Sequence, residues 1–219
     1  MPSRLRPTAS IAADAILVGD PGRALLLAQE LLEEPKMSNH ARGLWGYTGR
    51  TPDGGALTIQ STGMGGPSAA LVLADLAELG VRRVVRVGSC TALRPKLQPG
   101  ALVAVAEAHA WSGPGGGAGE PMAPDAELAA ALREALGEGA REGTAASLDV
   151  LHGGGAPPPV TDGDVADMQT AALLGTASGL GIAAAAVLVV SEGAGGERLD
   201  DEGMEAAAKV AGHAAATVL

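Results

Sequence analysis

Cysteine and aromatic residues are nearly absent from this sequence. Cys90 is the only cysteine, so the chain can form neither an intrachain disulfide nor a cysteine-based metal site, which fits a reducing compartment. Phenylalanine is missing, and Trp45, Tyr47 and Trp111 are the only aromatic residues. A surface that stacks on a flat ring must therefore use these three rings or aliphatic side chains. The four histidines are scattered without the spacing of metal ligands, and we expect no metal site.

Basic residues are also scarce. The 219-residue chain has 15 Lys and Arg against 25 Asp and Glu, a formal net charge of −10, which argues against nucleic acid or an anionic membrane as a partner. No apolar run is long enough to span a bilayer, and the N-terminus lacks the apolar stretch of a signal peptide. We therefore expect a soluble, cytoplasmic protein in which the few arginines stand out.

The apolar segments alternate between short β-branched runs and longer helical patterns. Strands are predicted over residues 14–18, 47–50, 56–61, 83–87, 101–108, 142–151 and 182–190, and helices over 24–34, 69–80, 125–136, 166–180 and from 201 onward. This alternation is typical of an α/β fold with a largely parallel sheet. Residues 111–124 and 152–164 are rich in glycine and proline and are predicted to be loops. Without an internal repeat or a clean boundary, the sequence predicts one domain over residues 1–219.

One arginine lies inside a predicted buried strand. Val84, Val85 and Val87 surround Arg86, and Gly88 follows directly. A guanidinium group keeps its proton, so its burial without a partner is very costly. Either a carboxylate of the protein neutralises Arg86, or its partner is an anion that binds and leaves.

Two glycine-bearing turns follow predicted strands. GDPGR (19–23) places Gly19 and the amides of a new helix at a strand end, with Arg23 on the first helical turn. VGSC places Ser89 beside Arg86 at another strand end, and together these groups would suit a phosphate or sulfate. The structural alternatives are a simple strand-to-helix connection and an arginine paired in the core. Neither a Gly-x-x-x-x-Gly-Lys loop nor a Gly-x-Gly-x-x-Gly fingerprint is present, so triphosphate hydrolysis and dinucleotide binding are not indicated.

Four motifs in this order resemble the nucleoside phosphorylase family, which includes hexameric purine nucleoside phosphorylases and uridine phosphorylases. They are GDPGR (19–23), NHARGLWGYTG (39–49), STGMGGPS (61–68) and RVGSC (86–90), and the similarity runs from about residue 14 to 105 and again from 143 to 192. The resemblance implies a three-layer α/β/α domain with a central mixed, largely parallel sheet. It also implies a pentosyltransferase that cleaves a purine or uridine-type nucleoside with inorganic phosphate, giving free base and pentose 1-phosphate without a cofactor.

The resemblance further implies roles for single residues. Gly19, Arg23, Arg86 and Ser89 would bind the phosphate, and Arg42 would reach into the active site of a neighbouring subunit, so a homodimer or homohexamer is expected. Arg86 would then be a buried charge whose partner is the substrate. Arg86 would also be catalytic, because positioning and electrostatics drive the reaction through an oxocarbenium-like state.

The sugar end departs from the family pattern. The family carries Glu-Met-Glu, the last Glu holding the ribose hydroxyls, where this chain has Asp167, Met168 and Gln169. Gln169 can still donate and accept hydrogen bonds but has lost the charge that makes a carboxylate the stronger acceptor. We expect weaker binding of ordinary ribose or a preference for a modified sugar. The alternative is that these residues form the polar face of a helix.

The base end departs as well. A Ser-Asp pair of the purine-specific relatives becomes Ser191 and Glu192, and Glu192 would be a catalytic proton donor to the base if burial raises its pKa. Cys90 and Thr91 would lie near the base, and Leu151 stands where relatives stack a Phe. The alternative for Glu192 is a carboxylate on a surface loop.

Two other functions stay open. A nucleosidase that uses water would share the fold, but the retained Arg23, Arg42 and Arg86 count against it. A catalytically weakened homologue that binds a nucleoside or phosphate is supported by the altered sugar and base residues.

Overall fold

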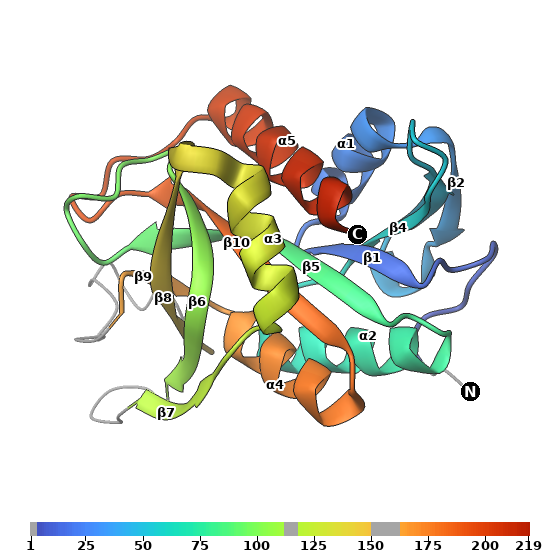
Figure 1. Ribbon diagram of the computed structural model, residues 1–219, viewed down its shortest axis with the longest axis horizontal. Helices are drawn as coiled ribbons and strands as arrows, with labels where there is room; N and C mark the ends of the chain where they lie inside the picture. Colours follow the sequence, from blue (N-terminus) through green and yellow to red (C-terminus); the bar gives the residue numbers. More distant parts are fainter. Residues whose placement is uncertain (1–3, 112–117, 150–162) are drawn as a thin grey trace.

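Ten strands form one mixed sheet with helices on both faces in the computed structural model, which describes residues 4–111, 118–149 and 163–219 (Figure 1). The strands are β1 (Asp14–Val18), β2 (Glu33–Asn39), β3 (Gly46–Arg50), β4 (Ala56–Ser61), β5 (Arg83–Ala92), β6 (Leu102–Trp111), β7 (Ala118–Met122), β8 (Ala140–Leu148), β9 (Val165–Asp167) and β10 (Ala183–Glu192). The helices are α1 (Pro21–Leu31), α2 (Gly66–Glu78), α3 (Ala126–Leu136), α4 (Thr170–Leu180) and α5 (Asp201–Val218), with short 3₁₀ turns at Ala41–Gly43 and Gly137–Gly139.

The centre of the sheet is parallel and its margins are antiparallel. β4, β1, β5 and β10 lie side by side in parallel, whereas β2–β3, β3–β4, β10–β6 and β6–β7 are antiparallel pairs. The strand order is β10-β6-β8-β9-β5-β1-β4-β3-β2, and β5 also pairs with β10, so five strands close into a ring at one end of the sheet.

Two apolar layers separate the sheet from its helices. α1, α3 and α5 cover one face, where Leu27 and Leu132 pack on strand residues such as Val85, and α2 and α4 cover the other, where Leu73 and Leu174 pack near Val84 (Figure 1). The central strands are thus buried on both faces, which explains their β-branched runs. The predicted α/β/α fold class with a central mixed sheet is confirmed.

The predicted end of the first helix, at residue 34, was wrong. Helix α1 stops at Leu31, the following Leu32 is extended, and Glu33 and Glu34 begin strand β2, which the sequence analysis missed. Pro35 disfavours helical backbone at the residue before it, and this outweighs the helical pattern of the Leu and Glu side chains.

The predicted helix over residues 166–180 also begins later than expected. Residues 165–167 form the short strand β9, which pairs with both β5 and β8, and α4 starts at Thr170. Asp167 therefore lies on a strand in the interior of the sheet, so the alternative of an exposed polar helix face is wrong for it. The predicted loop over 111–124 contains strand β7, and most of the predicted loop over 152–164 lies outside the described residues.

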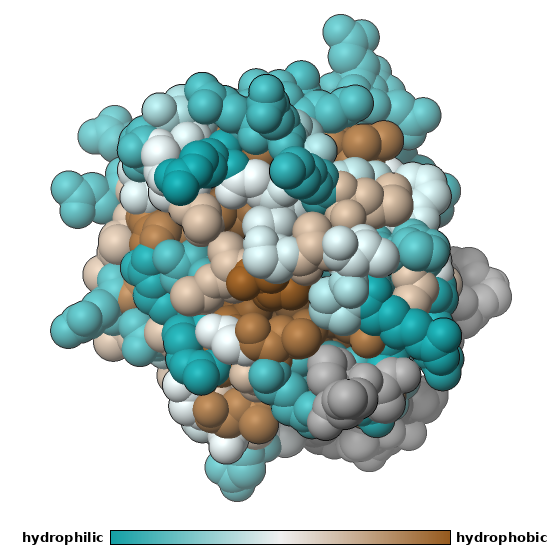
Figure 2. All heavy atoms as spheres, turned by 90° about the vertical axis from the view of Figure 1, so that its right-hand side faces the viewer, coloured by the Kyte–Doolittle hydropathy of each residue, from teal (hydrophilic) through white to brown (hydrophobic). Residues whose placement is uncertain are grey.

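In the described ranges, no helix is long and apolar enough to cross a membrane, and no group of three or more His, Cys, Asp or Glu residues could hold a metal ion. The face on the right of Figure 1, turned toward the viewer in Figure 2, is largely hydrophilic with an apolar area near its centre.

Candidate anion-binding site

The site is a cavity at the carboxyl end of the parallel strands. β1 pairs with β5 up to Leu17 opposite Arg86, then ends at Val18 while β5 runs on to Ala92. The chain turns away into α1 beside Gly88 and Ser89, which leaves a crevice of about 570 Å³. Its walls are residues 19–21 and 23, 42–44, 63–65 and 167–169, together with Arg86, Gly88 and Ser89 of β5. Ligands bind at such strand ends in open α/β sheets.

This cavity brings together every residue that the sequence analysis assigned to phosphate or sugar. Gly19, Arg23, Arg42, Arg86 and Ser89 all line it. So do the three sugar candidates, Asp167, Met168 and Gln169. One expectation differs in detail: Ser89 lies within β5, paired with β10, and faces the crevice because the neighbouring strand β1 has ended.

The turn after β1 starts α1 with a capped end. The Asp20 carboxylate accepts a hydrogen bond from the backbone N–H of Arg23 at 2.7 Å, and Pro21 occupies the first turn. This places Arg23 and the positive end of the helix dipole at the cavity. Burial lowers the pKa of the Arg23 guanidinium; Asp20 opposes the shift, and the charge of nearby Arg86 adds to it. Two arginines that repel each other at one cavity would both gain from a bound anion.

The structure gives Arg86 a carboxylate partner within the protein. Arg86 is only 4% exposed. Its guanidinium donates a hydrogen bond from Nη2 to Asp167 Oδ2 at 2.9 Å. It also donates from Nη1 to Gln169 Oε1 at 2.7 Å and from Nε to Thr170 Oγ1 at 3.1 Å. The expectation that the partner of this buried charge is only the substrate was therefore wrong. These contacts use three of the five N–H groups of an arginine, at a cavity that Arg86 itself lines.

Gly88 makes room for that guanidinium. A Cβ atom at position 88 would lie 2.6 Å from Arg86 Nη2 and 2.7 Å from Arg86 Cζ, closer than carbon atoms approach in proteins. The Arg-x-Gly spacing in RVGSC is thus explained by packing, because residues i and i+2 of a strand point to the same face.

The loop after β4 forms a wall of the cavity that the sequence analysis did not assign. Gly63, Met64 and Gly65 line the cavity, and Met64 is 86% exposed. Gly63 has a φ of 72°, a backbone conformation that favours glycine. The cluster of glycines in STGMGGPS was the available signal, since glycines allow a close approach of backbone to a ligand.

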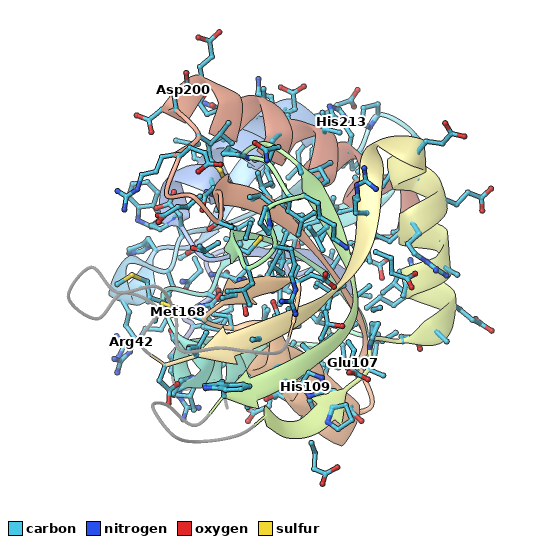
Figure 3. All side chains as sticks on the ribbon, turned by 90° about the vertical axis from the view of Figure 1, so that its left-hand side faces the viewer. Arg42, Glu107, His109, Met168, Asp200 and His213 are labelled. Carbon is cyan, nitrogen blue, oxygen red and sulfur yellow. The ribbon has the colours of Figure 1, made fainter. Side chains whose placement is uncertain are left out.

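Arg42 lies at the mouth of the cavity. It sits in the 3₁₀ turn Ala41–Gly43 with a φ of 60°, which is uncommon for a residue other than glycine. Its side chain is exposed at the edge of the molecule on the same side as Met168 (Figure 3). The predicted reach of Arg42 into a neighbouring subunit stays a prediction.

The described residues among those predicted to bind the base do not line this cavity. Among the described residues, Cys90 and Thr91 are buried inside the sheet, and the Ser191 hydroxyl donates to the carbonyl of Cys90 at 3.0 Å next to a β-bulge in β10. Glu192 accepts from Arg198 at 3.1 Å. The predicted proton donor is thus paired with an exposed arginine and is not among the residues that line the cavity. Leu151 lies outside the described residues.

Cys90 is expected to be unreactive in the folded protein. Burial strongly raises the pKa of the thiol, and the charge of Asp167 adds to this while Arg86 opposes it, so almost no thiolate forms near neutral pH. We expect no modification by a thiol reagent at pH 8 over a period in which the urea-unfolded chain reacts completely. Rapid reaction of the native protein would instead mean that the β5–β10 pairing opens readily.

The fold and this cavity define an α/β protein with a cationic crevice suited to a small anion. The chain belongs to the phosphorylase superfamily, whose family model matches residues 14–219. It is similar to the DeoD-type purine nucleoside phosphorylases of Oceanobacillus iheyensis (44% identical over 85 residues) and Caldanaerobacter subterraneus (39% over 89 residues). These alignments cover 38% and 40% of this chain but only 36% and 38% of those relatives.

Two solved structures share the fold over nearly the whole chain. The purine nucleoside phosphorylase of Toxoplasma gondii, solved with immucillin-H, superposes with a TM-score of 0.80 at 25% identity, covering 95% of this chain and 90% of that one. A uridine phosphorylase of Phytophthora capsici superposes with a TM-score of 0.83 at 21% identity, covering 97% and 91%. The latter likeness shows the fold alone.

Proposed function

We propose that the protein is a nucleoside phosphorylase, a pentosyltransferase that cleaves a purine or uridine-type nucleoside with inorganic phosphate. The observation that carries this proposal is the meeting of Arg23, Arg86, Ser89 and the N-terminus of α1 at one cavity. Such a set supplies charge-assisted hydrogen bonds to phosphate oxygens. The family membership and the relatives named above are consistent with it.

The chemistry follows from how these groups hold the anion. Arg86 and Arg23 bind phosphate beside the anomeric carbon, and as the C1′–N bond breaks its electron pair leaves with the base. The negative phosphate stabilises the oxocarbenium-like sugar, and one of its oxygens then forms the new C1′–O bond. The base gains a proton from solvent to balance the one that hydrogen phosphate loses as its oxygen bonds C1′, and the products are free base and pentose 1-phosphate. In this proposal inorganic phosphate is a co-substrate and no cofactor takes part.

The proposal includes assembly into a homodimer or homohexamer. Arg42 supports this part of the proposal, because it lines the cavity, is exposed, and has a backbone conformation that is uncommon for a residue other than glycine. We propose that it completes the phosphate site of a neighbour.

A second candidate function is binding of phosphate or a nucleoside without turnover. The Glu192–Arg198 ion pair favours it, because the predicted proton donor to the base is engaged elsewhere.

Release of free base from a nucleoside panel separates these functions. The panel comprises inosine, adenosine, guanosine, uridine and thymidine, assayed with and without inorganic phosphate. We expect release that depends on phosphate and is accompanied by pentose 1-phosphate, because the three arginines that line the cavity would attract the attacking anion. Equal release in both conditions would indicate hydrolysis. No release, together with a melting temperature that phosphate raises, would indicate the binding protein.

A further inference from the structure

The segment from Asp167 to Thr170 wraps around one guanidinium group. Three of its side chains accept hydrogen bonds from Arg86, at 2.9 Å (Asp167), 2.7 Å (Gln169) and 3.1 Å (Thr170). All three residues are at least 97% buried. These hydrogen bonds hold the long Arg86 side chain in one conformation. An anion that binds to it therefore does not pay the entropy cost of ordering that side chain.

The Asp167 carboxylate is fully occupied by the protein. Beyond Arg86, it accepts from the hydroxyls of Ser147 and Thr170 and from the backbone N–H groups of Gln169 and Thr170. Most of these bonds end on Oδ2, Ser147 bonds Oδ1, and the side chain is 0% exposed, so a ligand hydroxyl has no open approach to this carboxylate.

The Gln169 amide is occupied at both ends. Its Oε1 accepts from Arg86 and from Thr62 Oγ1 at 3.1 Å, and its Nε2 donates to the carbonyls of Gly63 at 2.7 Å and Gly65 at 3.3 Å. Only an amide can do both, because a carboxylate at this position would face two carbonyl oxygens. Gln169 therefore joins Arg86 to the loop that forms another wall of the cavity.

Because Gln169 is neutral, the charged residues that line the cavity keep a net positive charge. Among the described residues that line the cavity are three arginines (Arg23, Arg42 and Arg86) and two aspartates (Asp20 and Asp167), an excess of one positive charge. A carboxylate at position 169 would cancel that excess next to Arg86, where burial strengthens the interaction of charges.

We propose that Asp167 and Gln169 are positioning residues of the anion site, which fix Arg86 and keep the cavity cationic, and are not ligands of a sugar. The inference rests on the proposed function in that the anion is taken to be inorganic phosphate. It replaces the sugar role that the sequence analysis assigned to these two residues.

The test is calorimetric titration of the full chain with inorganic phosphate. Nucleoside turnover by the same variants is measured in a separate assay. We expect Gln169→Glu to weaken phosphate binding at least about tenfold, since a buried carboxylate then competes for Arg86. The double variant D167N/Q169E restores the charge excess and is expected to recover most of that loss. Asp14→Asn serves as a control, because Asp14 pairs with Arg83 at the other end of β1 and β5, outside the cavity lining.

Thr170→Val gives a second variant that keeps the side-chain shape. It removes the acceptor for Arg86 Nε, and we expect a several-fold rise in the KM for phosphate with the KM for nucleoside unchanged. Unchanged phosphate binding in Q169E and T170V would overturn the inference, as would a Q169E variant that uses ribonucleosides better at unaltered phosphate affinity. Phosphate binding by the wild type without nucleoside cleavage would overturn the proposed function alone.

Discussion

Replacing Arg86 by methionine is expected to remove phosphate binding and to lower the free energy of unfolding by about 3–5 kcal/mol. Methionine fills a similar volume but leaves the Asp167 carboxylate, 1% exposed, without its positive partner. A buried charge without a partner is costly, whereas the loss of binding follows from the loss of one of the cations that line the cavity. Urea unfolding measures the first effect, and calorimetric titration with phosphate measures the second.

A double variant separates these two effects. R86M/D167N replaces the ion pair by two neutral residues and is expected to regain much of the lost stability but none of the phosphate binding. Arg83→Met is the matched control on the same strand: its partner Asp14 has a side chain 22% exposed, so water can solvate the freed carboxylate and the cost is about 1 kcal/mol. Equal costs for R86M and R83M would contradict the buried pairing of Arg86.

Replacing Gly88 by alanine is expected to weaken phosphate binding at least about tenfold, although the change adds only one methyl group. The new Cβ would lie 2.6 Å from Arg86 Nη2 and 2.7 Å from Leu188 Cδ2, and Leu188 is fully buried. The guanidinium can yield only by leaving Asp167 and Gln169, which displaces the cation that faces the cavity. Overpacking of this kind also lowers stability by about 1–3 kcal/mol.

The control for this variant is Gly179→Ala on the exposed end of α4. No atom lies within 4 Å of a Cβ there, so we expect unchanged phosphate binding and a stability gain of up to about 1 kcal/mol from helix propensity. Titration and urea unfolding of both variants check the pair of predictions. A Gly88→Ala variant that binds phosphate like the wild type would show that the position of Arg86 is not critical.

The errors of the sequence-based prediction have local physical causes. Glu33 and Glu34 continue a helical pattern, but Pro35 disfavours helix at Glu34, and Glu33 pairs with Arg50 of β3, which places the segment on strand β2. Asp167 precedes an alanine-rich helical pattern, yet its backbone completes the sheet between β5 and β8. In both cases hydrogen bonds to residues distant in sequence outweigh local propensity.

Some features of the candidate site could be predicted from the local sequence, and others depend on contacts between distant residues. The GDPGR turn and the two arginines could be recognised because strand, turn and helix start follow one another in the chain. The partner of Arg86 could not, because Asp167 lies 81 residues away and nothing in its neighbourhood marks it as a member of an ion pair. The ion pair between Glu192 and Arg198 could not be predicted either. Only 6 residues separate the two, but the pair depends on how the chain turns after β10.

The sequence by itself determined the α/β class and the family, because hydrophobic periodicity and short motifs are properties of consecutive residues. It also predicted that the charged side chain of Arg86 lies inside a buried strand and needs a partner. Only the tertiary structure decided the answer, which is that Asp167, Gln169 and Thr170 hold Arg86 at the edge of the cavity. The reason is physical: burial makes a charge depend on whichever groups the fold brings within hydrogen-bond distance, and those groups come from distant parts of the chain.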